Sequence, residues 1–376
     1  MSSGRLPRIL PVLLILLIAA SRGSAVEADR HSWPLFRAGS LALGVAPGSL
    51  PQKLDVLWTF SSEGGWFEST PAIVDASVFI GSTNGNLHAL QLDSGKQRWA
   101  FKTDLGFNAS PAVREGLVYI GDVDGRFYCI AADGGKRWQF DAGAEINSGA
   151  NFYKDKVLFG SQDGLLYCLD SATGRLAWKY ESEDQIRCFP TIVENRAFVA
   201  GCDARLHLID LDRGEQVANV ELESPTGSTP AVLADLLFVG TEGSIFYAID
   251  WKTPKVVWQF AAERRRMPFR GSAAATAAVV VVGSMDKNLY ALEPKTGKLL
   301  WTFPTRGRIE GSPVVVGQRV FIGSGDGRLY ALDLKTGREL WHYETGGSLI
   351  GSPAVVEGRL VIGTDDGKLY CFGGKE

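Results

Sequence analysis

Short apolar runs alternate with turns rich in glycine, aspartate and asparagine along most of the chain, and together they form a repeated unit. In one complete copy, an apolar run at 320–323 is followed by an Asp-Gly turn and a second run at 329–332. A Thr-Gly turn and a Trp-x-Tyr run at 341–343 come next, and the following copy opens with a Pro-entered run at 352–356. Short apolar runs bounded by such turns are typical of β-strands. Each unit therefore predicts four strands.

One tryptophan marks the fourth strand of nearly every unit. Ala218 replaces it once, and the successive positions are 41, 39, 40, 40, 40, 43 and 40 residues apart. A period of this length, built from short strands, predicts a β-propeller, and one indole per sheet suits packing between neighbouring blades. We interpret these tryptophans as blade-docking residues: Trp58, Trp99, Trp138, Trp178, Trp258, Trp301 and Trp341.

The two ends of the repeat region complement each other. The last unit stops after its third strand at 370–372, whereas a lone fourth strand lies at 54–60 with Trp58 in register. Pairing these strands closes the ring and removes two exposed sheet edges. We therefore predict an all-β, eight-bladed propeller of four-stranded antiparallel blades over residues 54–376, in which the N-terminal strand completes the last blade. A lead-in at 26–53 precedes it.

The turn between the second and third strands is Asn-Gly or Asp-Gly in most units, as at 84–85 and 326–327. Two-residue hairpins favour these pairs because both residues take positive φ. Three units carry Asp203-Ala204, Glu242-Gly243 or Asp286-Lys287 instead. We expect longer or distorted turns there.

Residues 1–25 have the pattern of a signal peptide. Arg5 and Arg8 precede an apolar stretch at 9–20, and small residues follow at 23–25. We expect cleavage after Ala25 or Ala28, with an uncleaved anchor as the alternative. No cysteine lies near this site for lipid attachment, so we expect a soluble protein in the periplasm or outside the cell.

The charge of the chain argues against nucleic acid as a partner. Removing residues 1–25 deletes three arginines and no acid, so the net charge moves from −3 to −6, and a polyanion selects a basic surface. Zinc-ligand spacings, a nucleophile elbow and a phosphate loop are absent from the sequence. We expect a monomer with no catalytic residue and no metal site.

Two of the cysteines are candidates for a disulfide. Cys129, Cys168 and Cys371 replace a small residue after the third-strand tyrosine, which indicates buried filling. Cys188 and Cys202 flank a predicted hairpin in the fourth unit and could face each other. An exported protein would permit that bond, although a register slip of one residue would separate them.

The phrase Leu-Tyr-Ala-Leu-Asp-x-x-Thr-Gly-x-x-x-Trp at 329–341, altered at 166–178 and 289–301, resembles the tryptophan-docking repeat of the pyrroloquinoline quinone (PQQ) propellers. That family includes quinoprotein dehydrogenases and the outer-membrane assembly factor BamB, and the resemblance covers residues 54–372. The lead-in at 31–37 is similar to that of many exported bacterial members.

The resemblance implies two alternatives for function. Dehydrogenases of the family use an acidic base, a calcium ion beside the quinone and, in many members, a disulfide between adjacent cysteines. This chain has no Cys-Cys pair and lacks the long insertions that build such a site. We therefore favour a noncatalytic, BamB-like scaffold without a cofactor, and a PQQ-dependent oxidoreductase with calcium is the alternative.

Aligning the units on the Ser/Thr-Pro pair that begins the first strand shows which loop residues occupy equivalent positions in the repeat. The loops from each fourth strand to the next first strand should all emerge around the channel mouth. One aligned position varies in charge and should project into the mouth: Glu68, Asn108, Asn147, Arg187, Gly227, Arg270, Glu310 and Ile350. The preceding position is mostly apolar and should pack between blades: Phe67, Phe107, Ile146, Ile186, Thr226, Phe269, Ile309 and Leu349.

Variation within a regular repeat is where binding residues are usually placed. On this face Glu181, Glu183 and Asp184 form an acidic sector, whereas the longest loop, at 264–270, is basic and carries an apolar tip. The candidate partner-binding rim comprises Trp66, Phe67, Glu68, Arg187, Arg264, Arg265, Arg266, Phe269, Arg270, Arg306, Arg308 and Glu310. We expect an envelope protein or peptide as the partner, and a solvated loop without a partner is the alternative.

Overall fold

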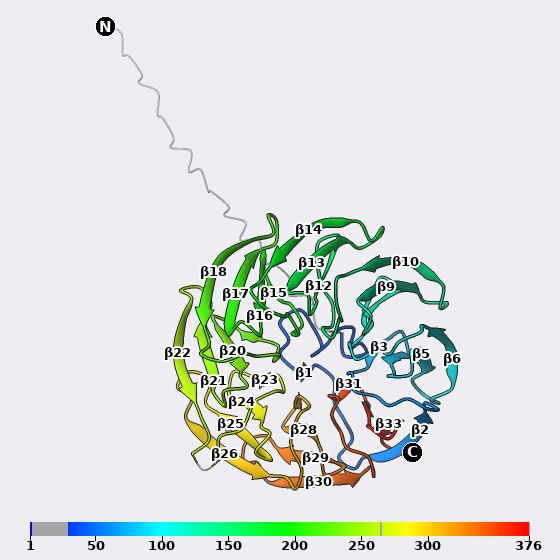
Figure 1. The fold of residues 1–376 in the computed structure, drawn as a ribbon. Coiled ribbons are helices and arrows are strands. Elements are labelled where there is room, and N and C mark those ends of the chain that lie inside the picture. Colours follow the sequence, from blue (N-terminus) through cyan, green and yellow to red (C-terminus); the bar gives the residue numbers. More distant parts are fainter. Residues whose placement is uncertain (2–28, 264, 376) are drawn as a thin grey trace.

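Eight four-stranded antiparallel sheets surround a central channel in the computed structural model, which describes Met1, residues 29–263 and residues 265–375 (Figure 1). In seven of the blades the chain runs outward from the channel in strand order. The first four blades are β3 (Ala72–Val74), β4 (Ser77–Gly81), β5 (Asn86–Gln91) and β6 (Gln97–Lys102); β7 (Ala112–Arg114), β8 (Leu117–Gly121), β9 (Arg126–Ala131) and β10 (Lys136–Asp141); β11 (Asn151–Tyr153), β12 (Lys156–Gly160), β13 (Leu165–Asp170) and β14 (Leu176–Glu181); β15 (Thr191–Val193), β16 (Arg196–Ala200), β17 (Arg205–Asp210) and β18 (Glu215–Glu221).

The second half of the ring repeats this arrangement. Its strands are β19 (Ala231–Leu233), β20 (Leu236–Gly240), β21 (Phe246–Asp250) and β22 (Lys255–Phe260); β23 (Ala274–Ala275), β24 (Val280–Gly283), β25 (Asn288–Leu292) and β26 (Leu299–Pro304); β27 (Val314–Val316), β28 (Arg319–Ser324), β29 (Arg328–Asp333) and β30 (Glu339–Glu344); β31 (Ala354–Val356), β32 (Arg359–Gly363) and β33 (Lys368–Gly373). All regular elements of the described residues are strands.

The ring closes as the sequence predicts. The N-terminal strand β2 (Asp55–Ser61) pairs antiparallel with β33 and supplies the fourth strand of the eighth blade, with Thr59 opposite Tyr370. Strands from the N-terminal and C-terminal parts of the propeller thereby share one sheet (Figure 1). The predicted eight-bladed architecture is confirmed.

The turn between the second and third strands differs from the two-residue hairpin expected. In the first blade the ladder ends at Gly81↔Leu87, the Ser82 N–H donates to the Asn86 carbonyl, and only Gly85 has positive φ, at 87°. The units without the usual glycine keep the same turn length. Ala204, Ser244 and Lys287 take the left-handed conformation there, at φ 62°, 68° and 77°. The prediction of longer or distorted turns in these three units is therefore wrong.

The tryptophans connect each blade to the next. The Trp58 Nε1–H donates to the Leu92 carbonyl at 2.6 Å, and its ring lies so close to Gly95, which has φ 67°, that a Cβ there would approach the ring to 2.6 Å. Five further indoles repeat both contacts: Trp99, Trp138, Trp178, Trp258 and Trp301. Each of these rings therefore packs between two blades and is hydrogen-bonded to the second of them.

Two seams depart from this rule. Trp341 packs edge-on against Phe372 at 5.8 Å, because the blade that follows it is the one made from both chain ends and has no Thr-Gly turn. At Ala218 the indole is missing, and Pro254 replaces the glycine that would support it. Trp251 of the next blade instead contacts Phe198 at 5.5 Å and donates its Nε1–H to the Ala234 carbonyl.

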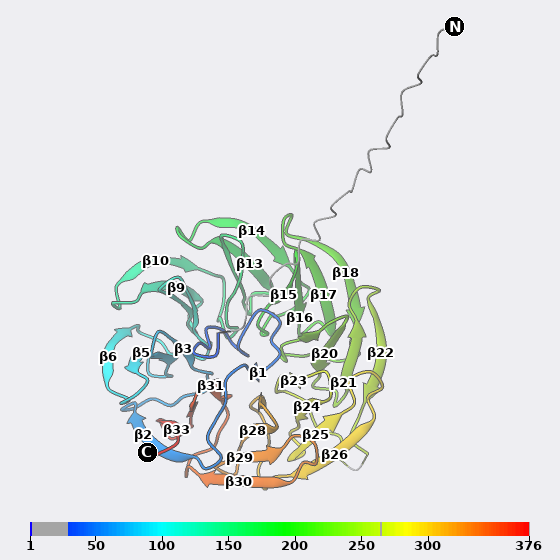
Figure 2. The same cartoon turned by 180° about the vertical axis from the view of Figure 1, so that it is seen from behind.

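A strap of irregular chain, residues 30–49, crosses one end of the channel inside the ring (Figures 1 and 2). Both of its ends bond the eighth blade, where Glu357 donates to the Arg30 carbonyl and Gly358 donates to the Ser49 carbonyl. Near its start, Trp33 and Ile73 of the first blade exchange both backbone hydrogen bonds. Between its two ends, β1 (Val45–Ala46) pairs parallel with β27. Other blades bond the strap through Val113, Asn151, Ile192, Val232, Ala275 and Val315. Every blade is thus hydrogen-bonded to the strap through a residue in or next to its innermost strand.

Cys188 and Cys202 do not pair, and the interpretation of a disulfide is wrong. Both are free thiols. Thr191 lies opposite Phe198, and continuing this register places Cys202 opposite Arg187. The Cys188 Sγ accepts the Ala200 N–H at 3.2 Å instead. A slip of one residue separates the two thiols.

Candidate functional site: the channel mouth

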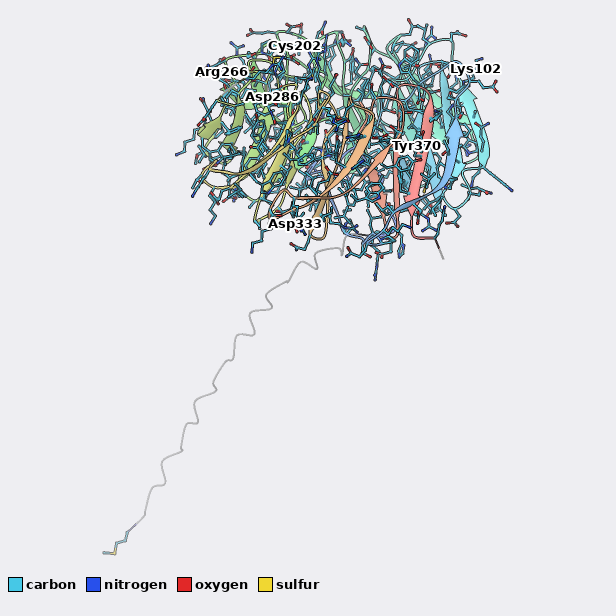
Figure 3. The ribbon with its side chains drawn as sticks, turned by 90° about the horizontal axis from the view of Figure 1, so that it is seen from below. Lys102, Cys202, Arg266, Asp286, Asp333 and Tyr370 are labelled. Carbon is cyan, nitrogen blue, oxygen red and sulfur yellow. The ribbon has the colours of Figure 1, made fainter. Side chains whose placement is uncertain are left out.

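The mouth of the channel opens on the face opposite the strap. In the side view Cys202, Arg266 and Asp286 lie on the mouth face, whereas Asp333 lies near the strap side (Figure 3). The mouth holds a cavity of about 190 Å³. All members of the charge-variable aligned set line it: Glu68, Asn108, Asn147, Arg187, Gly227, Arg270, Glu310 and Ile350.

The preceding loop position anchors each loop between blades. Phe107 is fully buried and packs on Gly81 of the first blade, where a Cβ would approach its side chain to 2.5 Å. Its backbone N–H donates to the Ser82 carbonyl. The other seven members of this set are also buried, at 1% exposure or less. Because each anchor holds the loop from below, the next residue is directed into the mouth.

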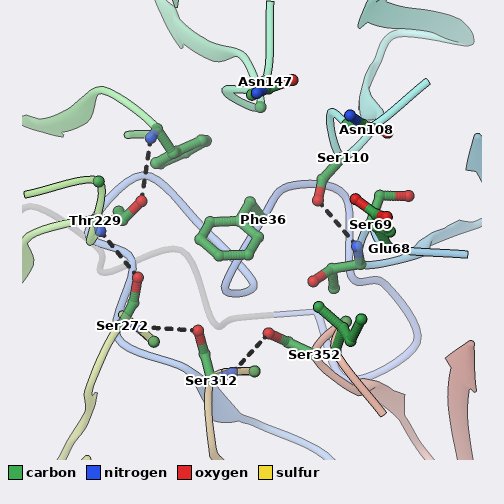
Figure 4. A pocket seen from close by; sticks show the side chains of 18 of the residues that line it. Phe36, Glu68, Ser69, Asn108, Ser110, Asn147, Thr229, Ser272, Ser312 and Ser352 are labelled. Atoms are coloured by element: carbon green, nitrogen blue, oxygen red, sulfur yellow. Dashed lines mark hydrogen bonds between the residues drawn. The ribbon is translucent and has the colours of Figure 1, made fainter. Parts of the chain in front are cut away.

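Below the rim, hydroxyl groups join the loops of successive blades into a ring. The backbone N–H of Ser272 donates to the Ser312 Oγ at 2.9 Å, and that of Ser312 donates to the Ser352 Oγ at 2.9 Å (Figure 4). The same bond links Thr70 to Ser110 and Thr229 to Ser272, both at 3.0 Å. Each hydroxyl accepts one backbone N–H and retains its own proton for a further bond.

This ring is interrupted at the third and fourth blades. Gly149 and Phe189 stand where the other blades carry Ser or Thr. Phe189 is buried, and its ring meets that of Phe36 at 5.9 Å. Phe36 comes from the strap and lies at the centre of the mouth view (Figure 4). The mouth therefore has an aromatic side and a hydroxyl side above a phenyl floor.

The sequence gives a signal for one of these aromatic residues but not for the other. Phe189 stands out in the alignment of the units, because it occupies a position otherwise given to small or hydroxyl residues. Phe36 lies in the lead-in, outside the repeat, and its position depends on the path of the strap.

The rim charges are partly neutralised by one another. The Arg270 Nε lies 3.0 Å from a Glu242 oxygen, and its Nη1 lies 3.8 Å from a Glu310 oxygen. Arg187 donates to the Gln185 amide oxygen at 2.9 Å, and Glu68 accepts the Trp66 Nε1–H at 2.9 Å. Within the described part of the chain, Arg187 forms no ion pair with a carboxylate. Arg187 is therefore one of the rim cations that could pair with an acidic ligand.

The other rim candidates have different exposures. Trp66 is 46% exposed, and Arg265, Arg266, Arg306 and Arg308 are exposed. Arg308 lines a second hollow beside the mouth. Arg264 lies outside the described residues.

Two of the proposed rim contacts need correction. Phe67 is fully buried and Phe269 is 1% exposed, because both are anchors between blades. A partner would therefore not contact either side chain. The expected apolar tip of the basic loop is reduced to Met267, which is half-buried.

A repeated pair of polar residues fixes the turns around this face. The Tyr330 hydroxyl donates to an Asp326 carboxylate oxygen at 2.8 Å, and Tyr128 does the same to Asp122 at 2.9 Å. Burial, followed by the hydrogen bond to Asp326, raises the pKa of Tyr330 to about 12. His207 replaces this tyrosine in the fourth blade and bonds Asp203 at 2.7 Å. These pairs tie the third strand of a blade to the turn that precedes it.

The described residues around the mouth present no clustered set of carboxylates for a calcium ion beside a quinone. Calcium takes six to eight oxygen ligands, usually including carboxylates, yet no three His, Cys, Asp or Glu side chains gather as a metal set among residues 29–263 and 265–375. Pockets for organic ligands typically measure about 300–1,000 Å³, and the mouth cavity is about 190 Å³. We derive no catalytic step from it.

The fold and the mouth define a propeller of PQQ-like repeats with a polar, plugged channel. The profile of the family described as Outer membrane protein assembly factor BamB matches residues 55–259 and 255–375. The chain belongs to this family.

Three known proteins illustrate the likeness. BamB of Shewanella oneidensis is 24% identical over 222 residues, which make up 54% of this chain and 55% of that protein, so the chain spans about half the length of this relative. The crystal structure of BamB from Moraxella catarrhalis gives a TM-score of 0.73 at 20% identity and covers 86% of this chain and 98% of its own. A europium-containing methanol dehydrogenase gives 0.80 at 14% identity, over 93% of this chain and 99% of its own. Both structural likenesses concern the fold alone.

The described residues contain no helix long and apolar enough to cross a bilayer. The predicted signal segment at 1–25 falls almost wholly outside the described residues.

Proposed function

We propose that this protein is a noncatalytic scaffold of the cell envelope that holds a protein or peptide segment at the channel mouth. The mouth itself is the observation that carries this proposal. Its rim varies in charge around a regular ring, its walls offer hydroxyl protons, and its floor is an aromatic ring. Such a funnel suits a protruding loop or a chain end better than a flat surface would.

The shape of the funnel supports a peptide rather than a planar cofactor. A cavity of about 190 Å³ accepts one or two side chains, and the larger binding energy then comes from the surrounding rim. Arg187 and the exposed loop arginines supply attraction for an acidic segment. Trp66, half-exposed beside the mouth, supplies an aromatic contact.

Membership in the BamB family supports a place in the envelope. The family and its Shewanella oneidensis member are described as outer membrane protein assembly factor BamB, and residues 1–25 have the pattern of an export signal. We propose export, removal of this segment and action as a soluble monomer on an envelope protein.

Site-specific photocrosslinking tests the proposal. A photoreactive residue is placed at Asn108 or Arg187 on the rim and, as a matched control, at the exposed Lys136 on the outer strand β10. We expect a discrete adduct with one envelope protein from the rim positions and none from the control. Equal adducts from both positions, or none from the rim, would contradict binding at the mouth.

Calorimetry with PQQ and calcium tests the alternative separately. We expect no saturable heat and no dye reduction with alcohols or sugars. Stoichiometric quinone binding with turnover would contradict the scaffold proposal and favour the oxidoreductase alternative.

A further inference from the structure

A buried arginine lies at the centre of the strap. Arg37 is 1% exposed, and its Nη2 donates to the Ala273 carbonyl of the sixth blade at 2.9 Å. Its Nε and Nη1 are buried and form no hydrogen bond with any of the described residues. A buried cation is costly unless its donors are paired, and buried donors without partners are rare in folded proteins. The guanidinium therefore has donors left for a ligand.

The strap holds Arg37 in place at a conformational cost. Arg37 and Ala38 both have positive φ, at 64° and 77°, which is uncommon for residues with a side chain. The guanidinium lies against Gly44, where a Cβ would approach Nη2 to 1.8 Å. Backbone bonds on both sides of the loop, to Val113 and Val315, fix its ends. Residues in such conformations persist where the surroundings determine them, and they gather at ligand sites.

Arg37 also lines a cavity of about 460 Å³ that is open to solvent and is formed by the strap together with Asp29. The walls are mainly apolar and include Pro34, Leu41, Leu43 and Val45. The volume lies within the usual range for small organic ligands. This hollow and the channel mouth share no lining residue.

The Arg37 guanidinium at the cavity is cationic at neutral pH. Burial lowers the pKa of Arg37 to about 9, so the guanidinium is still protonated at pH 7. Asp29 is the other charged residue on the wall; it is exposed, and its carboxylate accepts the His31 N–H at 2.9 Å.

We infer that the strap cavity binds a small aliphatic carboxylate, whose anionic head pairs with Arg37 and whose apolar body lies against the strap. Guanidinium and carboxylate are matched in charge and hydrogen bonding, and the apolar wall selects an aliphatic body over a bare ion. This site is separate from the proposed binding of a peptide at the mouth.

Isothermal titration of the purified protein with hexanoate tests the inference. We expect saturable binding in the millimolar range or tighter, and at least about tenfold weaker binding of hexanol and hexylamine, because a hydrogen bond to a charged group contributes about 1.5–3 kcal/mol. Equal binding of hexanol would show that the charge is not recognised. No saturation by about 20 mM hexanoate would overturn the site.

Three variants locate the binding. Arg37→Met should abolish hexanoate binding, and Asp29→Asn should preserve or tighten it. Because Arg37→Met changes the strap interior, Leu41→Trp serves as a second variant; Leu41 is partly exposed and lines the cavity, so the added bulk should block hexanoate while the backbone bonds of the strap remain. Undiminished binding in folded Leu41→Trp would place hexanoate elsewhere and overturn the inference.

Discussion

Phe36 of the strap and Phe189 of the fourth blade meet with ring centroids 5.9 Å apart and planes inclined by 55°. This contact joins the segment that crosses the channel to the part of the mouth, at the third and fourth blades, where the hydroxyl ring is interrupted. The aromatic side of the mouth thus depends on two residues far apart in the sequence. The strap that crosses the channel therefore also shapes the mouth, because it supplies Phe36.

Phe189→Ser should restore a hydroxyl to the ring and remove the aromatic contact. Phe189 is 2% exposed, and truncating a buried phenylalanine typically costs about 3–5 kcal/mol. The new hydroxyl can recover part of this by accepting a backbone N–H from the third blade. We expect a net loss of about 2–3 kcal/mol in urea unfolding. A variant as stable as the parent would show that the aromatic floor contributes no stability.

Trp58→Ala and Trp341→Ala form a matched test of the indole contacts. Trp58 donates to the Leu92 carbonyl and lies on Gly95, whereas Trp341 forms neither contact among the described residues. Trp58→Ala should cost about 3–5 kcal/mol, and Trp341→Ala should cost less. Denaturant midpoints measure both. Equal losses of unfolding free energy in the two variants would mean that the buried area of the indole determines the stability of a seam. The hydrogen bond and the glycine contact with the next blade would then contribute nothing.

The blade architecture could be predicted from the sequence because each unit repeats its neighbours. The pairing of Thr59 with Tyr370 follows from the missing strand at one end and the extra strand at the other. The alignment of units likewise separates the anchors from the residues that line the mouth. Repetition supplies the register that a single hairpin does not specify.

Other features lie beyond that reasoning. The strap has no repeat, and non-glycine residues such as Arg37 and Ala42 take left-handed conformations in it, at φ 64° and 53°. The disulfide prediction failed by one residue of register at Cys188. Phe269 was placed on the basic rim from its charged neighbours, although its position among the anchors requires burial.

Trp251→Ala should uncover the seam between the fourth and fifth blades. Its ring contacts Phe198 where Ala218 leaves no indole. We expect a loss of about 3 kcal/mol or more. Adding Ala218→Trp to this variant should recover part of the loss, because an indole from the fourth blade can then pack on Phe198. If the double variant is no more stable than Trp251→Ala, the two residues do not compensate for each other.

Acid should loosen the end of the strap through Glu357. Its oxygens accept the Ser49 backbone N–H at 3.0 Å and the Ser49 hydroxyl at 2.6 Å, and these bonds lower the pKa of Glu357 from its usual 4.5. A lowered folded-state pKa stabilises the fold above about pH 4.5, and that contribution is lost as pH falls through the lowered value.

Glu357→Gln removes this titration and is the control. Between about pH 6 and pH 3.5, the melting temperature of the parent should fall further than that of the variant. If the melting temperatures of the parent and the variant fall in parallel with pH, the ionised carboxylate of Glu357 does not stabilise the strap through Ser49.

Reversing the charge of the basic loop should weaken the binding of a partner without unfolding the protein. Arg265 and Arg266 are exposed and, within the described ranges, form no ion pair, and exposed charges contribute little to stability. Replacing Arg264, Arg265 and Arg266 by Glu should therefore leave the melting temperature nearly unchanged. Attraction between a cationic loop and an acidic partner acts mainly on the association rate and is screened by salt. The triple variant should accordingly bind the partner captured at the mouth more weakly at low salt and nearly equally at high salt.

Arg270→Glu provides the contrast. This change breaks the ion pairs with Glu242 and Glu310 and places three carboxylates together at the rim, so it should lower both stability and affinity. Surface plasmon resonance at two salt concentrations separates the two effects. If the triple variant binds as tightly as the parent at low salt, the basic loop takes no part in recognition, and the partner is held by the mouth residues around Arg187 instead.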